Sequence, residues 1–415
     1  MKEVFELTAG QIRGKRNLYL CVSTVGLLVL GLIYAWSIFS GPLAAHTGYT
    51  RGDLQITFTL SMIFFCLGAL AGSFINKVIS VRNTLLIAAV LLAAGFAGTA
   101  LLATSHIAVI YVCYGVFCAA SCGIGYNTII ATVGLWFPDK TGFASGVMMM
   151  GFGLGSLILG SIASTLIASM GIQATFYILA VAGFVVTFAI AALIRTAPSN
   201  IVREMAPHRL AAGSEEKPVI KAGYVYSAPI FLVYCVFALT AICAGLTLIG
   251  SAKPGAEAVG VSASFATLFV GLVSTMNGIS RVIVGTIYDR TNLKVALFVV
   301  ATVGVLASIG VTAAYSASLP ILYIVSGLAI GFSYGGIPVV AAAFAREGFG
   351  AKHYPTNLAT VNLNIALAAF LSQGLISFTS PDGTATHPSV WIGVIVVSVI
   401  ALLAVVAFSM VYKKS

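Results

Sequence analysis

The sequence predicts an all-α integral membrane protein with twelve transmembrane helices in two pseudo-symmetric six-helix bundles. Three observations lead to this fold class: the composition, the length of the apolar segments and an internal repeat. Of the 415 residues, 60% are hydrophobic and only 8% are charged, whereas a soluble domain carries about 25% charged residues. Long apolar runs separated by short polar breaks indicate helices, because the strands of a membrane barrel are short and alternate in polarity.

The apolar segments reach the length of about 20 residues that a helix needs to cross a bilayer. We expect helices near residues 18–40, 55–76, 83–104, 107–135, 142–168, 174–195, 227–250, 263–287, 294–315, 319–342, 357–379 and 389–411. The longest polar stretch separates the sixth helix from the seventh and contains Pro198, Pro207 and Pro218. These features divide the chain into an N-terminal bundle (1–195), a cytoplasmic linker loop (196–224) and a C-terminal bundle (225–415).

The distribution of basic residues predicts the orientation, because Lys and Arg concentrate in cytoplasmic loops. With both termini in the cytoplasm, eighteen of the 21 Lys and Arg residues lie on the cytoplasmic side, and only Arg51 and Lys253 lie in outer loops. We therefore expect a multi-pass protein of the plasma (inner) membrane. The net charge of +10 is therefore explained by basic residues that orient the protein in the lipid bilayer, and we expect no nucleic-acid partner.

Arg281 is the remaining basic residue and the only formal charge within an apolar segment. On a helix it shares one small and polar face with Ser274, Asn277, Gly278 and Gly285. A charge at this depth costs roughly 2.5–3.5 kcal/mol on insertion scales, and the apolar segments contain no acid to pair with it. We expect an anionic substrate to be the missing partner. The alternative is that the long side chain extends toward the cytoplasm or pairs with backbone carbonyl groups.

A short pattern occurs once in each half of the chain. After the second helix, Gly72 is followed four residues later by Asn76 and a basic residue; after the eighth, Gly285 is followed by Asp289 and Arg290. The two copies lie about half the chain apart. We predict that Gly72, Gly285, Asp289 and Arg290 form a motif that controls conformational change. A parallel repeat of six helices places the site near the midplane, between the halves.

Longer motifs resemble a known family. The stretches Gly31–Leu43, Gln55–Ser61 and Trp136–Gly146, together with Asn277-Gly278 and Arg281, resemble the oxalate/formate antiporter family of the major facilitator superfamily. The similarity extends roughly from Gly31 to Gln373. The family is related to the proton-linked monocarboxylate transporters, so the resemblance implies a carrier of small carboxylates.

The resemblance also implies roles for individual residues. In that family the arginine of helix eight binds the substrate carboxylate, which corresponds to Arg281. Aromatic residues of helices one, four and ten line the cavity, and the matching positions are Tyr34, Tyr126 and Tyr334. A phenol offers one hydrogen bond and an apolar ring, which suits a small organic anion. For any single tyrosine, ordinary helix packing is the alternative.

The eleventh helix departs from the family pattern. The oxalate exchanger carries a lysine there, whereas residues 357–367 contain no Lys or Arg. Asn357, Thr360 and Asn364 share one face, and we include Thr360 and Asn364 among the expected substrate-binding residues. One fixed positive charge matches one carboxylate, so we favour a monocarboxylate such as lactate, pyruvate, formate or glycolate over oxalate.

Several alternatives stay open at this point. The proton-linked relatives carry an aspartate one turn before the arginine, where this chain has Asn277, so proton symport and anion exchange are both possible. A carrier of a non-carboxylate ligand, and a channel or transport-like receptor, are the rival functions. The seven cysteines show no CxxC spacing, and no nucleophile–base or metal-ligand pattern occurs. We expect a monomer that is not an enzyme and needs no cofactor or metal.

Overall fold

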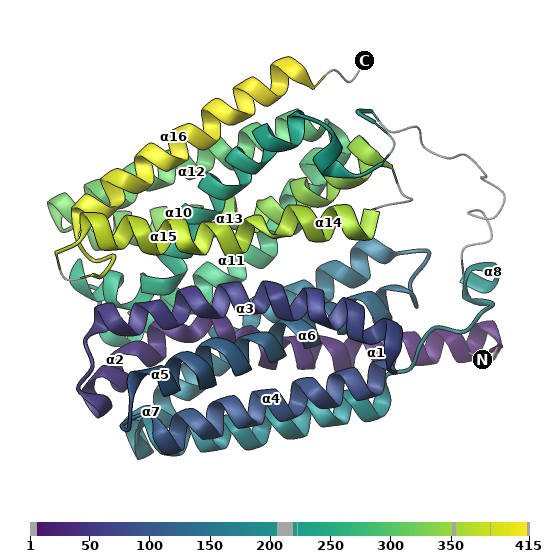
Figure 1. Ribbon diagram of the computed structural model, residues 1–415, viewed down its shortest axis with the longest axis horizontal. Helices are drawn as coiled ribbons and strands as arrows, with labels where there is room; N and C mark the ends of the chain where they lie inside the picture. The colour runs from purple at the N-terminus through teal and green to yellow at the C-terminus, as the bar shows by residue number, and fades with distance from the viewer. Residues whose placement is uncertain (1–5, 206–218, 222, 351–353, 382, 413–415) are drawn as a thin grey trace.

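The computed structural model describes residues 6–205, 219–221, 223–350, 354–381 and 383–412. Regular secondary structure in this part of the chain is entirely helical (Figure 1). In chain order the elements are α1 (Ala9–Leu30), η1 (Gly31–Ala35), α2 (Trp36–Thr47), α3 (Arg51–Val78), α4 (Val81–Leu102), α5 (Ile107–Ile110), η2 (Tyr111–Cys118), α6 (Ala119–Gly134), α7 (Thr141–Leu193), α8 (Ile201–Met205), η3 (Val225–Ser227), α10 (Ile230–Ala258), α11 (Ala263–Arg290), α12 (Leu293–Ala317), α13 (Pro320–Phe349), α14 (Tyr354–Asn362), α15 (Asn364–Thr379) and α16 (Pro388–Val411).

Polar caps set the starts of many long helices, because the first backbone N–H groups of a helix have no partner within it. Thr8 and Gln11 form a capping box at the start of α1. The side chains that accept hydrogen bonds at the starts of α3, α4, α11 and α12 belong to Thr50, Ser80, Ser262 and Asn292.

Eleven helices in the described residues are long and apolar enough to cross a bilayer. One of them, α7, has 53 residues and is too long for one crossing, because a helix rises 1.5 Å per residue and the hydrocarbon core is about 30 Å thick. Gly171 interrupts α7 with φ 83° and ψ 167°, and its two parts match the fifth and sixth helices predicted from the sequence. The predicted all-helical membrane fold is therefore confirmed.

Two helices differ from their predicted form. The first begins at Ala9 and, with a 3-10 turn at Gly31–Ala35, continues to Thr47. The eleventh is broken at Leu363, where α14 ends and α15 begins. The N–H of Leu363 bonds to the carbonyl of Thr360 at 3.3 Å, a tighter turn than in an α-helix.

Helices α1–α7 lie on one side of the molecule and α10–α16 on the other (Figure 1). The start of α1 and the end of α16 lie at the same end, called here the terminal end; the opposite end is the distal end. The bundle boundaries predicted from the sequence stay a prediction, and residues 206–218 and 222 of the predicted linker lie outside the described residues.

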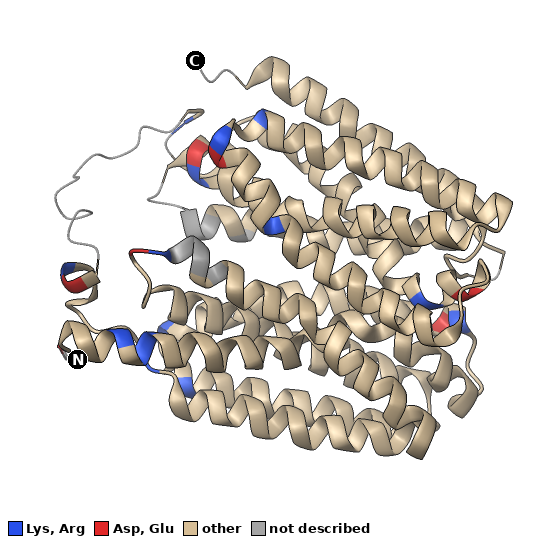
Figure 2. Cartoon of the chain, turned by 180° about the vertical axis from the view of Figure 1, so that it is seen from behind, with Lys and Arg blue, Asp and Glu red and all other residues tan. Residues whose placement is uncertain are grey.

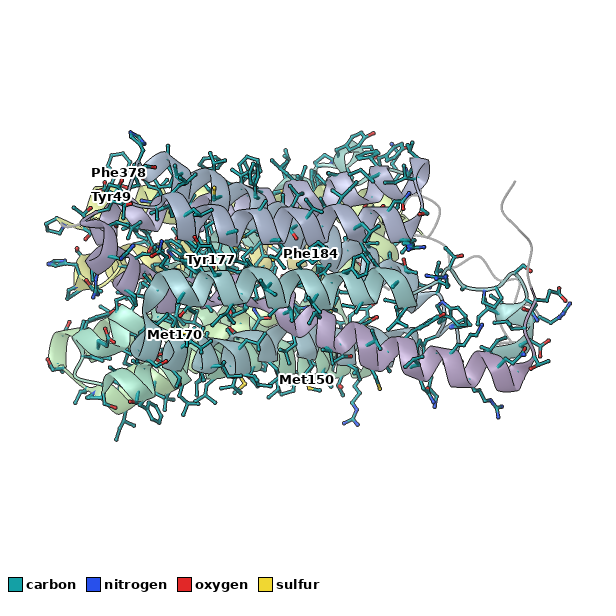
Figure 3. The ribbon with its side chains drawn as sticks, turned by 90° about the horizontal axis from the view of Figure 1, so that it is seen from below. Tyr49, Met150, Met170, Tyr177, Phe184 and Phe378 are labelled. Atoms are coloured by element: carbon teal, nitrogen blue, oxygen red, sulfur yellow. The ribbon has the colours of Figure 1, made fainter. Side chains whose placement is uncertain are left out.

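Polarity varies along the molecule as a bilayer requires. Most of the charged residues gather at the two ends, and few lie between them (Figure 2). Met170, Tyr177 and Phe378 are exposed, and Figure 3 shows such side chains along the outside of the helices. Exposed apolar surface of this extent marks contact with lipid.

The two groups of helices touch on the distal side of the centre. A Cβ added at Gly153 of α7 would lie 2.6 Å from the carbonyl oxygen of Ser274 of α11. Between α3 and α15, the Thr59 hydroxyl donates a hydrogen bond to Gln373 Oε1 at 3.2 Å. Small residues permit such close approach of membrane helices. These contacts close the distal side of the space between the two groups.

We expect Gly335→Ala to destabilise the protein. The added Cβ would lie 2.1 Å from the carbonyl oxygen of Asn277, and overpacking of this kind costs about 1–3 kcal/mol. Gly374→Ala is the matched control, because no atom lies within 4 Å of its added Cβ. Thermal unfolding of the purified protein in detergent measures both. Equal melting temperatures for the two variants would contradict the close α11–α13 contact.

Candidate functional site

A cavity of about 840 Å3 lies between the two groups of helices. Met62, Phe65 and Phe152 line it from the first group, and Ile242 and Leu358 from the second. Toward the terminal end the lining continues through Leu135, Pro138, Ala197 and Pro198, which lie in the connections after α6 and α7. The cavity therefore extends toward the terminal end, while the contacts described above close its distal side.

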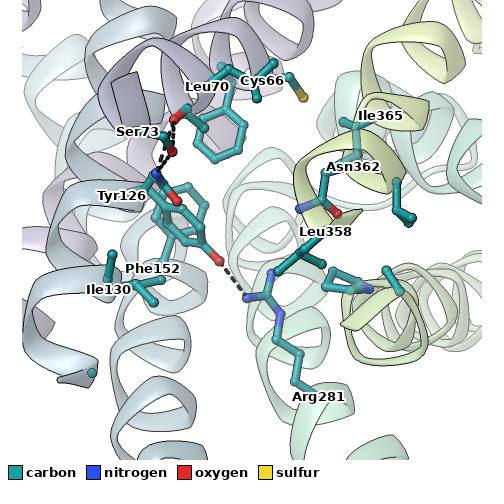
Figure 4. A pocket seen from close by; sticks show the side chains of 18 of the residues that line it. Cys66, Leu70, Ser73, Tyr126, Ile130, Phe152, Arg281, Leu358, Asn362 and Ile365 are labelled. Carbon is teal, nitrogen blue, oxygen red and sulfur yellow. Dashed lines mark hydrogen bonds between the residues drawn. The ribbon is translucent and has the colours of Figure 1, made fainter. Parts of the chain in front are cut away.

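Arg281 places a positive charge in this cavity. It precedes the end of α11 at Arg290 by nine residues, or about 13 Å along the helix. Its Nη1 donates a hydrogen bond to the Tyr126 hydroxyl at 3.2 Å (Figure 4). Its Nη2 donates to Asn277 Oδ1 at 3.4 Å. None of the ion pairs among the described residues includes Arg281. Its neighbours are neutral dipoles, which leave the charge uncompensated.

Two buried donors beside this charge have no partner. Asn277 is 2% exposed; its oxygen accepts from Arg281, but its Nδ2 has no hydrogen-bond partner among the described residues. The same is true of Arg281 Nε. An unmade hydrogen bond of a buried polar group costs about 1–3 kcal/mol. The Arg281 cation supplies one of these free N–H donors and Asn277 supplies the other. This arrangement suits an anion that accepts hydrogen bonds on two oxygens.

Three aromatic side chains of the first group of helices, Tyr34, Tyr126 and Phe152, line the cavity together with Arg281. Tyr126 of α6 contacts Phe152 of α7 edge to face, with ring centroids 5.0 Å apart. Phe152 also makes an edge-to-face contact with Tyr34, at 5.4 Å. Tyr34 lies in the 3-10 turn of the first helix. These contacts hold the phenol rings in fixed orientations next to the charge.

Tyr334 adds another aromatic ring to the cavity from the other group of helices. Its ring lies against Gly245 of α10, where an added Cβ would come within 2.6 Å of the ring. Tyr334 and Tyr34 line the cavity together with Arg281. The two groups of helices thus each contribute a phenol to the cavity that holds the guanidinium.

The structure brings most of the sequence-predicted site residues together. Arg281, Tyr34, Tyr126 and Tyr334 line the cavity, and Asn277 bonds to Arg281. Thr360 and Asn364 are not among the lining residues. The Asn364 amide instead donates to the carbonyl oxygen of Val361 at 2.8 Å and to Cys235 Sγ at 3.6 Å. Their expected part in substrate binding stays a prediction.

Two asparagines of the cavity were missed by the sequence analysis. Asn362 lines the cavity from α14, on the same group of helices as Arg281 (Figure 4). It shares one helical face with the lining residues Leu358, Val361 and Ile365, roughly opposite to the polar face chosen from the sequence. Asn127 also lines the cavity, and its Nδ2 donates to the Ser73 hydroxyl at 2.7 Å. Asn127 directly follows Tyr126 in the sequence, so the family motif that predicted Tyr126 could also have predicted Asn127.

The repeated motif lies at corresponding ends of α3 and α11. Gly72 packs closely on α6, where an added Cβ would lie 3.2 Å from the Cα of Ile124. At Gly285 the nearest such atom is a Val339 methyl group at 3.9 Å. Asp289 and Arg290 are exposed. The gating role predicted for these residues stays a prediction.

Comparison with known proteins gives a family and relatives. The sequence model of the Major Facilitator Superfamily matches residues 21–373. The uncharacterized MFS-type transporter YhjX of Escherichia coli K12 is 26% identical over 370 residues, which cover 88% of each chain. The oxalate:formate antiporter of Oxalobacter formigenes is 24% identical over 283 residues, which cover 67% of this chain and 64% of the antiporter.

Solved structures share the fold at low sequence identity. The xylose transporter XylE from E. coli, in a partially occluded inward open conformation, has a TM-score of 0.72 and 13% identity, and the match covers 97% of this chain and 99% of XylE. A POT family transporter in complex with 5-aminolevulinic acid has a TM-score of 0.75 and 12% identity, covering 96% of both chains. Similarity at this level concerns the arrangement of helices alone.

The rate at which the Cys66 thiol is modified tests whether the cavity is accessible to a small reagent. Cys66 lines it, whereas Cys122 and Cys243 are buried outside its lining. Because a thiol reagent must reach the sulfur, we expect a small methanethiosulfonate to modify Cys66 faster than the other two. Peptide mass spectrometry after timed labelling of the native protein measures the three rates. Similar rates at all three cysteines would exclude an accessible cavity at this place.

Proposed function

The chain belongs to the Major Facilitator Superfamily, and we propose that it carries small monocarboxylate anions across the plasma membrane by alternating access. It is a multi-pass membrane transporter and not an enzyme. The single observation that carries the substrate proposal is the Arg281 guanidinium, which faces the cavity between the helix groups without an acidic partner among the described residues. The carboxylate of the substrate would bind there.

The donors around Arg281 support a carboxylate as the ligand. One oxygen would accept from Arg281 Nε and the other from Asn277 Nδ2, the two buried donors that lack partners in the described part of the chain. Hydrogen bonds between charged groups are about twice as strong as neutral ones. The aromatic rings of Tyr34, Tyr126 and Phe152 would contact the short carbon chain of the substrate.

The charge of the cavity supports a monocarboxylate. Among the described lining residues, Arg281 carries the only formal charge, and the amides of Asn127 and Asn362 are neutral. A second carboxylate would be desolvated without a cation to compensate it, which costs several kcal/mol. Exchange of oxalate and formate is the second candidate, favoured by the similarity to the Oxalobacter antiporter.

The transport cycle follows from the direction in which the cavity opens. The asymmetry of the basic residues assigns the terminal end to the cytoplasm, so the open cavity corresponds to an inward-facing state. To face outward, the chain would separate the α7–α11 and α3–α15 contacts and close the terminal end. A bound carboxylate neutralises Arg281 and so lowers the electrostatic cost of the occluded state between the two.

Arg281→Gln should abolish carboxylate uptake. Loss of the charged partner of a buried pair costs at least about 3 kcal/mol, or more than a hundredfold in affinity. Uptake of radiolabelled lactate and pyruvate by proteoliposomes measures this effect. Arg195→Gln, outside the cavity lining, is the matched control. Unchanged uptake by Arg281→Gln would point to a ligand of another class.

Counterflow separates a carrier from a pore. Unlabelled lactate trapped inside proteoliposomes should accelerate the entry of labelled lactate, because the loaded site returns faster than the empty one. The measurement compares vesicles with and without internal substrate at the same external concentration. Entry that does not respond to internal substrate would indicate a channel.

Asn277→Ala and Tyr334→Phe should raise the apparent KM without preventing insertion. Loss of one hydrogen bond near a charge costs about 1.5–3 kcal/mol for Asn277, and about 0.5–1.5 kcal/mol for the Tyr334 hydroxyl. The corresponding rises in KM are about tenfold or more for Asn277→Ala and about two- to twelvefold for Tyr334→Phe. Concentration-dependent uptake, normalised to the protein in the vesicles, measures both. Wild-type kinetics in both variants would argue against this site.

Oxalate should compete poorly with lactate, because the second carboxylate finds no cation in the cavity. We expect an inhibition constant at least about tenfold above that of pyruvate, a difference of 1.4 kcal/mol or more. Competition assays in proteoliposomes, with and without an imposed pH gradient, measure selectivity and reveal proton symport as gradient-driven accumulation. Preferential oxalate exchange would favour the second candidate.

A further inference from the structure

Two basic residues from opposite sides of the molecule line one cavity at the distal end. Arg51 is the first residue of α3 and Lys253 lies near the end of α10, and both line a cavity of about 290 Å3. They are the two basic residues that the sequence assigns to outer loops. Because they belong to different groups of helices, only the fold brings them together.

Neither Arg51 nor Lys253 forms an ion pair with an acidic residue of the described ranges. Glu257, one turn after Lys253, is the acidic residue among the lining residues. Two positive charges and one negative charge leave the cavity with a formal charge of +1. Charges of like sign held close together favour the approach of an anion.

A buried hydroxyl adds a hydrogen-bond donor to this cavity. Ser37 lines it, is 2% exposed, and its Oγ has no hydrogen-bond partner among the described residues. The Ser40 hydroxyl, also in the lining, donates to the carbonyl oxygen of Ser37 at 3.4 Å. Buried polar groups normally have partners. An unpartnered donor in the same cavity as two cations therefore points to a ligand that accepts hydrogen bonds.

The position of this cavity connects it with the central one. Ser37 follows Tyr34 of the central cavity by three residues, about 4.5 Å along the helix. Gly41 and Pro42 line the distal cavity from α2, and Pro254 lines it from α10. These helices belong to opposite groups, so the cavity lies across the contact that must open in an outward-facing state.

We propose that this distal cavity is a second anion site, which binds a small carboxylate between Arg51 and Lys253 at the outer end of the transport path. The inference rests on the orientation and the anionic substrate class of the proposed function. The guanidinium and the ammonium group attract the carboxylate, and the Ser37 hydroxyl donates to it. Glu257 opposes the binding, so its neutralisation strengthens the site.

The test measures lactate binding to the purified full-length protein by saturation-transfer NMR. Arg281→Gln removes the central guanidinium and should leave one weak site. Adding Lys253→Gln should weaken the remaining binding at least about tenfold, whereas adding Glu257→Gln should strengthen it, because the two changes alter the charge in opposite directions. Adding Lys253→Arg should preserve binding. Lys221→Gln, an exposed lysine at the terminal end, is the matched control and should change nothing.

Two outcomes overturn the proposal. One is the absence of lactate binding to Arg281→Gln; the other is the same affinity with and without Lys253→Gln, judged in variants whose melting temperature is unchanged. Competition identifies the ligand class, because acetate should displace lactate at lower concentration than chloride. Equal displacement by chloride would overturn the carboxylate assignment. The proposed transport function fails separately, through normal lactate uptake by Arg281→Gln.

Discussion

The arrangement of the molecule depends on a positive charge held in its interior by neutral groups alone. The Tyr126 hydroxyl and the Asn277 amide orient the Arg281 guanidinium but leave its charge and its Nε available. Tyr126 belongs to α6 and Arg281 to α11, so this contact joins the two groups of helices. In the proposed function the carboxylate would bind to Arg281 Nε and Asn277 Nδ2, next to the contact with Tyr126. Substrate binding would then change the charge directly beside a contact between the two groups of helices.

Small residues of the neighbouring helices allow the close packing that positions these polar side chains. Gly335 lets α13 approach the backbone of α11 at Asn277, and Gly245 lets the ring of Tyr334 lie against α10. Within a bilayer, helices associate through such close packing, because lipid supplies no hydrophobic force between them. The polar residues of the site are thus positioned by neighbours that have no polar side chain of their own.

The sequence predicted the features that depend on composition and regular helical periodicity. Arg281, Tyr126 and Asn277 could be placed because each lies on a regular helix whose depth follows from 1.5 Å per residue. The break at Leu363 could not be foreseen, because no glycine or proline marks it. Thr360 and Asn364 were expected at the site because they share a polar face, whereas Asn362 lies on the opposite face and lines the cavity. Periodicity shows which residues share a face but not which face points into the cavity. The proximity of Arg51 and Lys253 was equally hidden, because it depends on how two distant helices pack.

The central cavity and the distal cavity each combine a net positive charge with a buried donor that lacks a described partner, and both lie between the two groups of helices. The contacts between them are uncharged: Thr59 bonds to Gln373, and Gly153 meets the backbone of α11. An ion pair across this region would have to break, with desolvated charges on both sides, each time the path opened. Neutral contacts avoid that cost. In the proposed cycle, selectivity for anions would therefore reside in the two cavities, and the uncharged region that separates them would open and close without breaking an ion pair.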